Sequence, residues 1–124
     1  MALLNREQLL TREELKTEKV NLGKGDFVYV RQMTGRERDR FEQSMVKEVK
    51  GDGDEIHYER SLEDFRAKLV VNTVCDENGK NLLQPEDYPV LSQNMSAARL
   101  ELIVNAAQRL NRISEADKEA LVKN

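Results

Sequence analysis

The sequence has 124 residues, of which 39% are hydrophobic and 35% are charged, which is enough apolar material for one core in a single domain. A formal net charge of -3 and a pI near 5.3 disfavour general affinity for nucleic acids, because a phosphate-binding surface needs a basic excess. The lone Cys75 excludes an internal disulfide and a multi-cysteine metal site, and a free thiol is typical of a reducing compartment such as the cytoplasm.

The chain opens with a helical signal over residues 5–14. Asn5 or Thr11 is suited to cap one or two helical turns, and we expect Leu9 and Leu10 to turn inward. Charged residues interrupt this segment before any apolar run is long enough for a signal peptide. No later run approaches the roughly 20 apolar residues of a membrane span.

A β-hairpin is predicted next. Residues 15–22 alternate between apolar and polar side chains, and residues 27–33 are rich in the β-branched and aromatic side chains typical of a half-buried strand. Gly23 and Gly25, on either side of Lys24, can adopt the positive φ angles of a tight turn. We therefore expect the two segments to pair.

A helix is predicted from Thr34 to about Lys50. Thr34 and Glu37 have the spacing of a capping box, in which each side chain bonds a free backbone N–H at the helix start. An apolar stripe follows at helical spacing and consists of Phe41, Met45, Val46 and Val49. The Gly- and Asp-rich residues 51–55 are expected to end this helix.

A central helix is predicted from about Ser61 to Val74, because residues 61–64 resemble a second capping start. Its apolar residues lie on more than one side, which indicates a buried helix, and they are Leu62, Phe65, Leu69, Val70, Val71 and Val74. Residues 76–80 contain Asn78-Gly79 and are expected to form a turn rather than a metal-binding loop.

The last part of the chain is predicted to be helical. Pro85 suits the first turn of a short helix, which Pro89 is expected to limit. Residues 94–110 form the longest amphipathic segment, with Leu100, Ile103, Val104, Ala107 and Leu110 on one face. Ser114 is expected to cap a final helix that reaches the C-terminus.

These elements predict an α+β fold over residues 1–124, in which a small N-terminal antiparallel β-hairpin or sheet packs against about four to five helices and helix predominates. We expect the strongest apolar side chains to be mostly buried, and these are Phe41, Phe65, Leu69, Ile103 and Leu110.

No motif indicates catalysis or metal binding. His57 is the single histidine and has no serine or cysteine nucleophile close in sequence, so a solvated loop histidine is the favoured interpretation. Asp52, Asp54 and Glu63 imitate three positions of a calcium loop, but Ile56 and His57 stand where that loop needs a ligand and a glycine. We therefore predict no metal site.

Phosphate binding also lacks support. Gly23-Lys24-Gly25 does not have the spacing of a phosphate loop. Arg36, Arg38 and Arg40 form a basic cluster, but acidic residues interleave with them, which favours a solvated helix face with short-range ion pairs. We predict no catalytic or cofactor-binding residue and hence no enzyme; a small metal-dependent nuclease that uses Asp52 and Asp54 is the remaining catalytic alternative.

Three segments carry a resemblance to a known family. From Val28 to Glu42 a strand leads into Thr34-Gly35-Arg36-Glu37 at a helix start, and this segment resembles the tail assembly chaperones of long-tailed, siphovirus-like bacteriophages and prophages. Residues 69–80 and 107–115 strengthen the resemblance, which covers roughly residues 20–124. None of these motifs is a catalytic signature, so their order along the chain counts for more than any one of them.

The resemblance implies an α+β domain with a small N-terminal sheet, made in the host bacterial cytoplasm and absent from the mature virion. Its implied partners are the tape measure protein, which it binds and keeps soluble, and the tail tube protein, whose subunits it helps to recruit. Copies of the chain could form a homo-oligomer, and no cofactor, nucleic acid or membrane is implied. The alternative is a structural or connector subunit, of the head-tail or tail completion kind, that stays in the virion.

Four apolar residues are candidates for contact with the tape measure protein. Met45 and Val49 lie on the first predicted helix, and Leu121 and Val122 lie on the last. Methionine adapts to irregular partners, and the last helix has only a short apolar stripe, so we expect these positions to be incompletely covered by the domain's own core.

Overall fold

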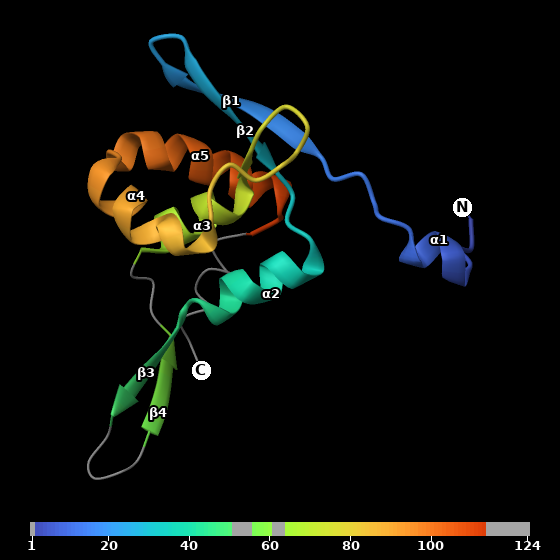
Figure 1. Cartoon of the computed structure of the whole chain (residues 1–124), viewed down its shortest axis with the longest axis horizontal. Helices are drawn as coiled ribbons and strands as arrows, with labels where there is room; N and C mark the ends of the chain where they lie inside the picture. The colour runs from blue at the N-terminus through green and yellow to red at the C-terminus, as the bar shows by residue number, and fades with distance from the viewer. Residues whose placement is uncertain (1, 51–55, 61–63, 114–124) are drawn as a thin grey trace.

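The computed structural model describes residues 2–50, 56–60 and 64–113, and over 47–50 and 56–60 it describes the backbone alone. The predictions for Leu62 and for a final helix beginning at Ser114 fall outside the described residues. The other elements can be followed along the chain in Figure 1.

The N-terminal hairpin forms as predicted. Strand β1, Thr17–Gly23, pairs antiparallel with β2, Asp26–Arg31. The chain reverses through positive φ angles of 93° at Gly23 and 82° at Gly25, which a residue without a Cβ adopts at little cost. The two glycines therefore fix the position of the turn.

A two-residue strand, β5, Val74–Cys75, pairs antiparallel with β2 and completes a sheet in the order β1-β2-β5. Helix α3 runs over Phe65–Thr73, so the prediction that Val74 belongs to this helix is wrong. The β-branched Val74 lies opposite Val30, where an extended backbone gains ladder hydrogen bonds from β2.

Helix α2, Gly35–Gln43, begins with the predicted capping box between Thr34 and Glu37. It ends well before the predicted boundary, because the backbone N–H of Ser44 reaches back to the carbonyls of Arg40 and Phe41 at 3.0 and 3.1 Å and closes the last turn.

The remainder of that predicted helix is a strand. β3, Val46–Lys50, pairs antiparallel with β4, Ile56–Arg60, and this second hairpin extends away from the domain (Figure 1). His57 lies opposite Val49 in the ladder, so the prediction of a loop histidine is wrong. The hydrophobic spacing of residues 41–49 fits a helix. In the structure, however, the backbone N–H and C=O groups of β3 form their hydrogen bonds with β4 instead of within a helix.

Helix α3 is the central helix, as predicted, and is in contact with α2, α4, Tyr88–Asn94, and α5, Ala97–Leu110. Helix α5 also packs against β1 and β2. One short 3₁₀ turn, Pro85–Asp87, leads directly into α4.

Two predicted helix boundaries differ from the structure. Pro89 is in the first turn of α4, where its missing N–H would have no partner anyway, so it does not limit a helix. Helix α3 starts at Phe65, and the residue before it, Asp64, has a φ of 58° and a side chain that makes no cap bond. The Asp64 carboxylate instead accepts a hydrogen bond from the Ser92 hydroxyl at 2.6 Å.

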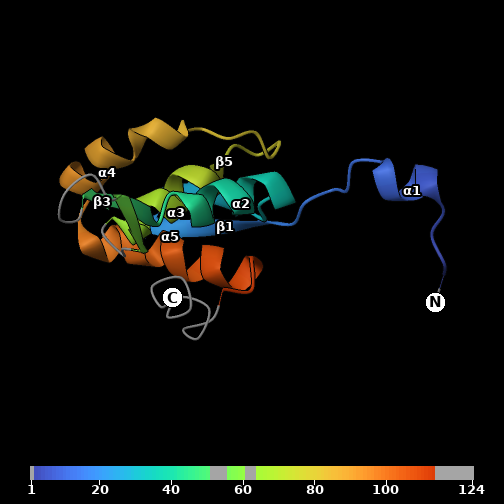
Figure 2. The ribbon, with the colours of Figure 1, turned by 90° about the horizontal axis from the view of Figure 1, so that it is seen from below.

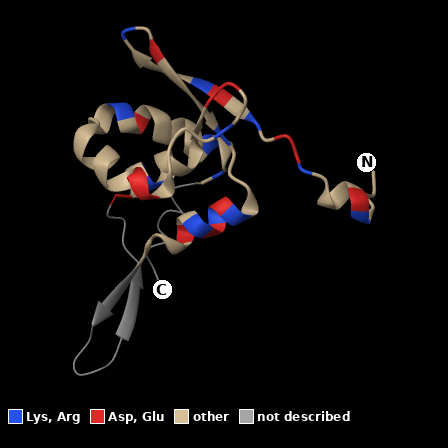
Figure 3. Ribbon diagram, in the orientation of Figure 1, with Lys and Arg blue, Asp and Glu red and all other residues tan. Residues whose placement is uncertain are grey.

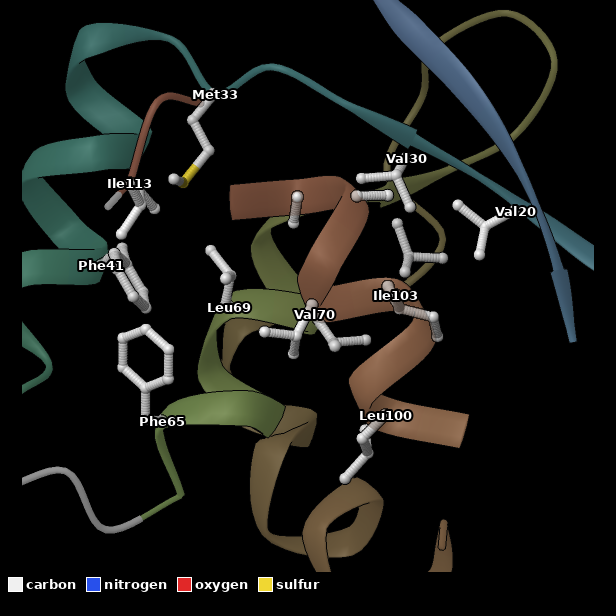
Figure 4. Packing of buried hydrophobic residues seen from close by; sticks show 14 of the residues in the cluster. Val20, Val30, Met33, Phe41, Phe65, Leu69, Val70, Leu100, Ile103 and Ile113 are labelled. Carbon is white, nitrogen blue, oxygen red and sulfur yellow. The ribbon is translucent and has the colours of Figure 1, made fainter. Parts of the chain in front are cut away.

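The core lies between the sheet and the helices, as Figure 4 shows. Phe41 and Phe65 meet edge to face with their ring centroids 5.6 Å apart, and Leu69 and Ile103 are buried in the same cluster. The predicted burial of these four side chains is confirmed. Leu110 is only partly buried and packs against the edge of the core.

Helix α1, Arg6–Leu10, forms at the predicted place, with Asn5 as its cap in a complete capping box. Leu9 and Leu10 are 67% and 68% exposed, so the prediction that they turn inward is wrong. Figures 1 and 2 show α1 standing apart from the domain, beyond the start of β1 and on the side away from α4. Capping is a local interaction and does not require that a helix be covered.

Candidate partner-binding surfaces

The three segments that carry the family resemblance meet around Arg31. This residue is 5% exposed, and its guanidinium bonds Glu37 at 2.5 Å, Asn81 at 3.1 Å and the Gln32 carbonyl at 3.0 Å. Glu37 belongs to the first segment, and Asn81 directly follows the second. A buried guanidinium needs such partners, because an unpaired charge away from water is strongly destabilising.

Asn111 brings the third segment to the same place. Its side-chain oxygen accepts the Met33 N–H at 2.7 Å, and its amide donates to Ala107 at 2.9 Å. Its backbone carbonyl accepts from Arg38 at 3.0 Å. The end of α5 is therefore attached to the link between β2 and α2, and residues of the resembling segments hold these elements together.

Charge in this cluster is balanced. Burial alone would raise the pKa of Glu37. The hydrogen bond and positive charge of Arg31, together with hydrogen bonds from Thr34 and Asn81, lower it by more, so the pKa lies below its ordinary value. Figure 3 shows acidic and basic residues alternating along α2, and Arg38 pairs with Glu42 at 3.0 Å one turn further on. The predicted short-range ion pair on this helix face is confirmed.

The turn predicted at residues 76–80 is present. The Asp76 carboxylate accepts backbone hydrogen bonds from Asn78 at 2.8 Å and Lys80 at 3.0 Å, and these bonds lower its pKa. A carboxylate used in this way organises a turn, as the sequence indicates.

Of the four predicted partner-binding residues, the structure describes the side chain of Met45 alone. Met45 is 1% exposed and belongs to the core, so the expectation that it is accessible is wrong. Val49 lies in β3, where only the backbone is described. Leu121 and Val122 fall outside the described residues, and their role stays a prediction.

An apolar groove of about 500 Å³ lies between α4 and the start of α5. Its apolar walls come from Leu83, Val90, Leu91 and Met95, and its charged walls come from Asp87 and Arg99. Val90 is 64% exposed, so the groove is open to a partner. The sequence carries little signal of this groove beyond a pair of adjacent apolar residues, Val90 and Leu91, in a short helix.

Arg99 is incompletely paired at this groove. One of its terminal nitrogens lies 3.2 Å from the exposed Asp26 carboxylate. Its Nε is buried and has no hydrogen-bond partner among the described residues. This Nε is therefore an unsatisfied buried donor beside the groove.

A second unpaired apolar surface is the N-terminal arm, which we define as residues 2–14. Every one of these residues is exposed. The arm presents four leucines to solvent, which are Leu3, Leu4, Leu9 and Leu10. Leu4 and Leu9 occupy the positions of a hydrophobic staple on either side of the Asn5 cap.

The described part of the chain also has a polar cleft. This cleft of about 580 Å³ lies between the arm and the 76–80 turn and is lined by charges of both signs, including Arg12, Glu13 and Lys80. No group of three potential metal ligands occurs among the described residues. None of the helices they form is long and apolar enough to cross a membrane.

The fold is that of a small α+β domain, as predicted, in which a three-stranded antiparallel sheet and helices α2 to α5 share one core. Among solved structures it is similar to the tail assembly chaperone of bacteriophage HK97, with a TM-score of 0.50 and 14% sequence identity over 78% of this chain and 87% of that chain. At this identity the likeness is one of fold, and at that level it confirms the predicted resemblance. The sequence itself matches no protein-family model and no curated protein.

Proposed function

We propose that this protein is a non-catalytic tail assembly chaperone of a long-tailed bacteriophage or prophage. The observation that carries the proposal is the fold shared with the HK97 tail assembly chaperone, which extends over 78% of this chain. The convergence of the three resembling segments on Arg31 and Asn111 supports it, because the motifs are then features of that fold.

In this role the chain binds the tape measure protein of its own phage, keeps it soluble in the host cytoplasm and helps to recruit tail tube subunits. The projecting β3–β4 hairpin, which carries Val49, and the C-terminal residues Leu121 and Val122 are the proposed contacts. A long helical partner exposes apolar stripes, and covering them prevents aggregation.

Co-expression tests the proposal. The tape measure protein is produced with this chain or with an empty vector, and we expect it to be soluble and to co-purify only with the chain. The variant Val49→Asp should reduce co-purification, whereas Leu102→Asp, at an exposed position on α5, should leave it unchanged. Equal solubility with and without the chain, and no co-purification, would reject the proposal.

The location of the protein gives a second test. We expect mass spectrometry of purified virions to detect tube and tape measure proteins but not this chain. Its presence in virions at a fixed number of copies would favour the connector-subunit alternative.

A further inference from the structure

We infer that the free edge of β1 binds an extended, acidic segment of another protein, which adds to the sheet as a further strand. The sheet runs in the order β1-β2-β5, so its two outer strands are β1 and β5. An outer strand with unpaired backbone groups is a template for another strand, and many proteins bind extended peptides in this way. This edge is separate from the surfaces that we assign to the tape measure protein.

The edge at β5 is covered by the chain itself. Asn81 forms a bridge with Cys75, and the backbone N–H of Leu82 donates to the Val74 carbonyl at 3.1 Å. The residues that follow β5 therefore fold back along it and take the position of a further strand. In the described part of the chain, this leaves β1 as the open edge of the sheet.

Backbone groups of three β1 residues point outward from the open edge. The Lys16 carbonyl accepts the Gln32 N–H at 3.0 Å, so Lys16 faces the β2 side. Because successive residues of an antiparallel strand face opposite sides, the N–H and C=O groups of Thr17, Lys19 and Asn21 point away from β2. All three residues are exposed, and no described residue bonds these outward groups. An added strand can therefore bond both groups of each residue without displacing any described part of this chain.

The open edge is held in place by helix α5. Near the start of β1, Glu18 pairs with Arg109, and near the turn of the hairpin, Asp26 pairs with Arg99 at 3.2 Å. Between these ion pairs in the sequence, Val20 is buried in the core (Figure 4). A strand that is already fixed loses little conformational freedom when another strand binds to it, so less of the binding energy is lost.

The charge at this edge favours an acidic occupant. The Lys19 ammonium lies 4.2 Å from the centre of the Phe27 ring and has no carboxylate partner among the described residues. Glu18 is paired with Arg109 on the opposite face of the sheet and does not neutralise Lys19. A carboxylate opposite Lys19 on an added strand would come within reach of this ammonium, and opposite charges across a ladder stabilise it.

Lys19 also disfavours pairing between the β1 strands of two copies of the chain. Antiparallel pairing centred on this residue would place the two lysines opposite each other, and like charges there destabilise a ladder. The residues of an added strand that alternate with the acidic one lie beside Val20 and Leu22, which pack in the core. The occupant is therefore a segment in which apolar and polar residues alternate and an acidic residue meets Lys19.

Synthetic peptides test the inference on the purified full chain, so the result does not depend on the tape measure protein. One probe is a capped fluorescent heptapeptide of alternating valine and threonine with glutamate in place of the central threonine; the other has lysine there. We expect the wild type to bind the glutamate peptide about fivefold more tightly, measured by fluorescence anisotropy. Lys19→Glu should reverse this preference. Lys24→Glu, the same change in the exposed turn, should leave it as in the wild type.

Two variants at Thr17 test the backbone ladder. Thr17→Pro removes an outward N–H at an edge position, where proline leaves the pairing with β2 in place, and should weaken binding of the glutamate peptide several-fold. Thr17→Val keeps this N–H and should bind as the wild type does. When the glutamate peptide binds, hydrogen exchange at the amides of Lys19 and Asn21 should slow, and exchange in the N-terminal arm should not change.

Three results would overturn the inference. One is that the glutamate peptide shows no saturable binding at millimolar concentration. Another is equal affinity for the two peptides, or a preference that Lys24→Glu reverses as fully as Lys19→Glu does. The third is a Thr17→Pro variant that binds as tightly as Thr17→Val, with unchanged exchange at Lys19 and Asn21, because the peptide would then bind elsewhere.

Discussion

At the scale of single residues, the buried pair of Arg31 and Glu37 should matter most for stability. The variant Glu37→Gln keeps the shape of the side chain and an oxygen for the helix cap, but leaves the 5% exposed Arg31 without its counter-charge. We expect a loss of about 2 kcal/mol in the free energy of unfolding, measured in urea.

The same helix supplies the control for this prediction. Glu42→Gln removes the exposed partner of Arg38 by the same chemical change, and should cost less than about 0.5 kcal/mol. Equal losses of unfolding free energy for Glu37→Gln and Glu42→Gln would show that burial does not increase the contribution of the Arg31–Glu37 pair to stability.

Acid should remove the stabilisation that Glu37 provides. Its pKa is lowered in the folded chain, so the unfolded chain takes up the proton first as the pH falls. The contribution is therefore complete at neutral pH and declines below about pH 4, where a free glutamate begins to protonate. We expect the difference in stability between the wild type and Glu37→Gln to narrow over that interval in urea titrations. A stability difference between the wild type and Glu37→Gln that stays constant down to pH 2.5 would contradict the ionised state assigned to Glu37.

At the scale of elements, α3 should contribute most to the core. Leu69→Ala removes a fully buried side chain from α3, the helix that contacts α2, α4 and α5. We expect a loss of about 3 kcal/mol in the free energy of unfolding. Leu9→Ala makes the same change on the exposed α1 and should cost less than about 0.5 kcal/mol. A comparable loss at Leu9 would mean that the arm packs on its own domain.

The elements that the sequence predicts well are those with local signals. The glycines of the β1–β2 turn and the Thr34–Glu37 capping box act over a few residues, and the structure has both where they were expected. The end of α2 has no such signal, since neither glycine nor proline follows Gln43. Val46 and Val49 fit one helix face equally well, and they form a strand because the next segment along the chain, β4, pairs with β3.

Local sequence patterns do not predict which apolar side chains are buried. Asn5 caps α1 as predicted, yet Leu9 and Leu10 stay exposed, whereas Met45, which was expected to be incompletely covered, is fully buried in the core. Whether a leucine or methionine is covered depends on elements far away in the sequence. The groove could not be predicted for the same reason, because its walls include Leu83 and Arg99, which α4 brings together.

At the scale of the whole molecule, Cys75 reports on how cooperatively the domain unfolds. It lies in β5 opposite Tyr29 and is buried, and burial raises the pKa of its thiol, an effect that Asp76 reinforces and Arg31 opposes. A thiol reagent therefore reaches Cys75 only when the strand is released from the sheet.

We expect the native chain to react with a thiol reagent at least about 10³-fold more slowly than the chain unfolded in urea, since a typical domain is stable by 5 kcal/mol or more. If β5 is released only by global unfolding, Leu69→Ala should speed the reaction about 100-fold, which corresponds to its expected loss of about 3 kcal/mol. Glu42→Gln should not change the rate. A fast reaction that is the same in the wild type and in Leu69→Ala would mean that β5 opens locally, independently of the core around α3.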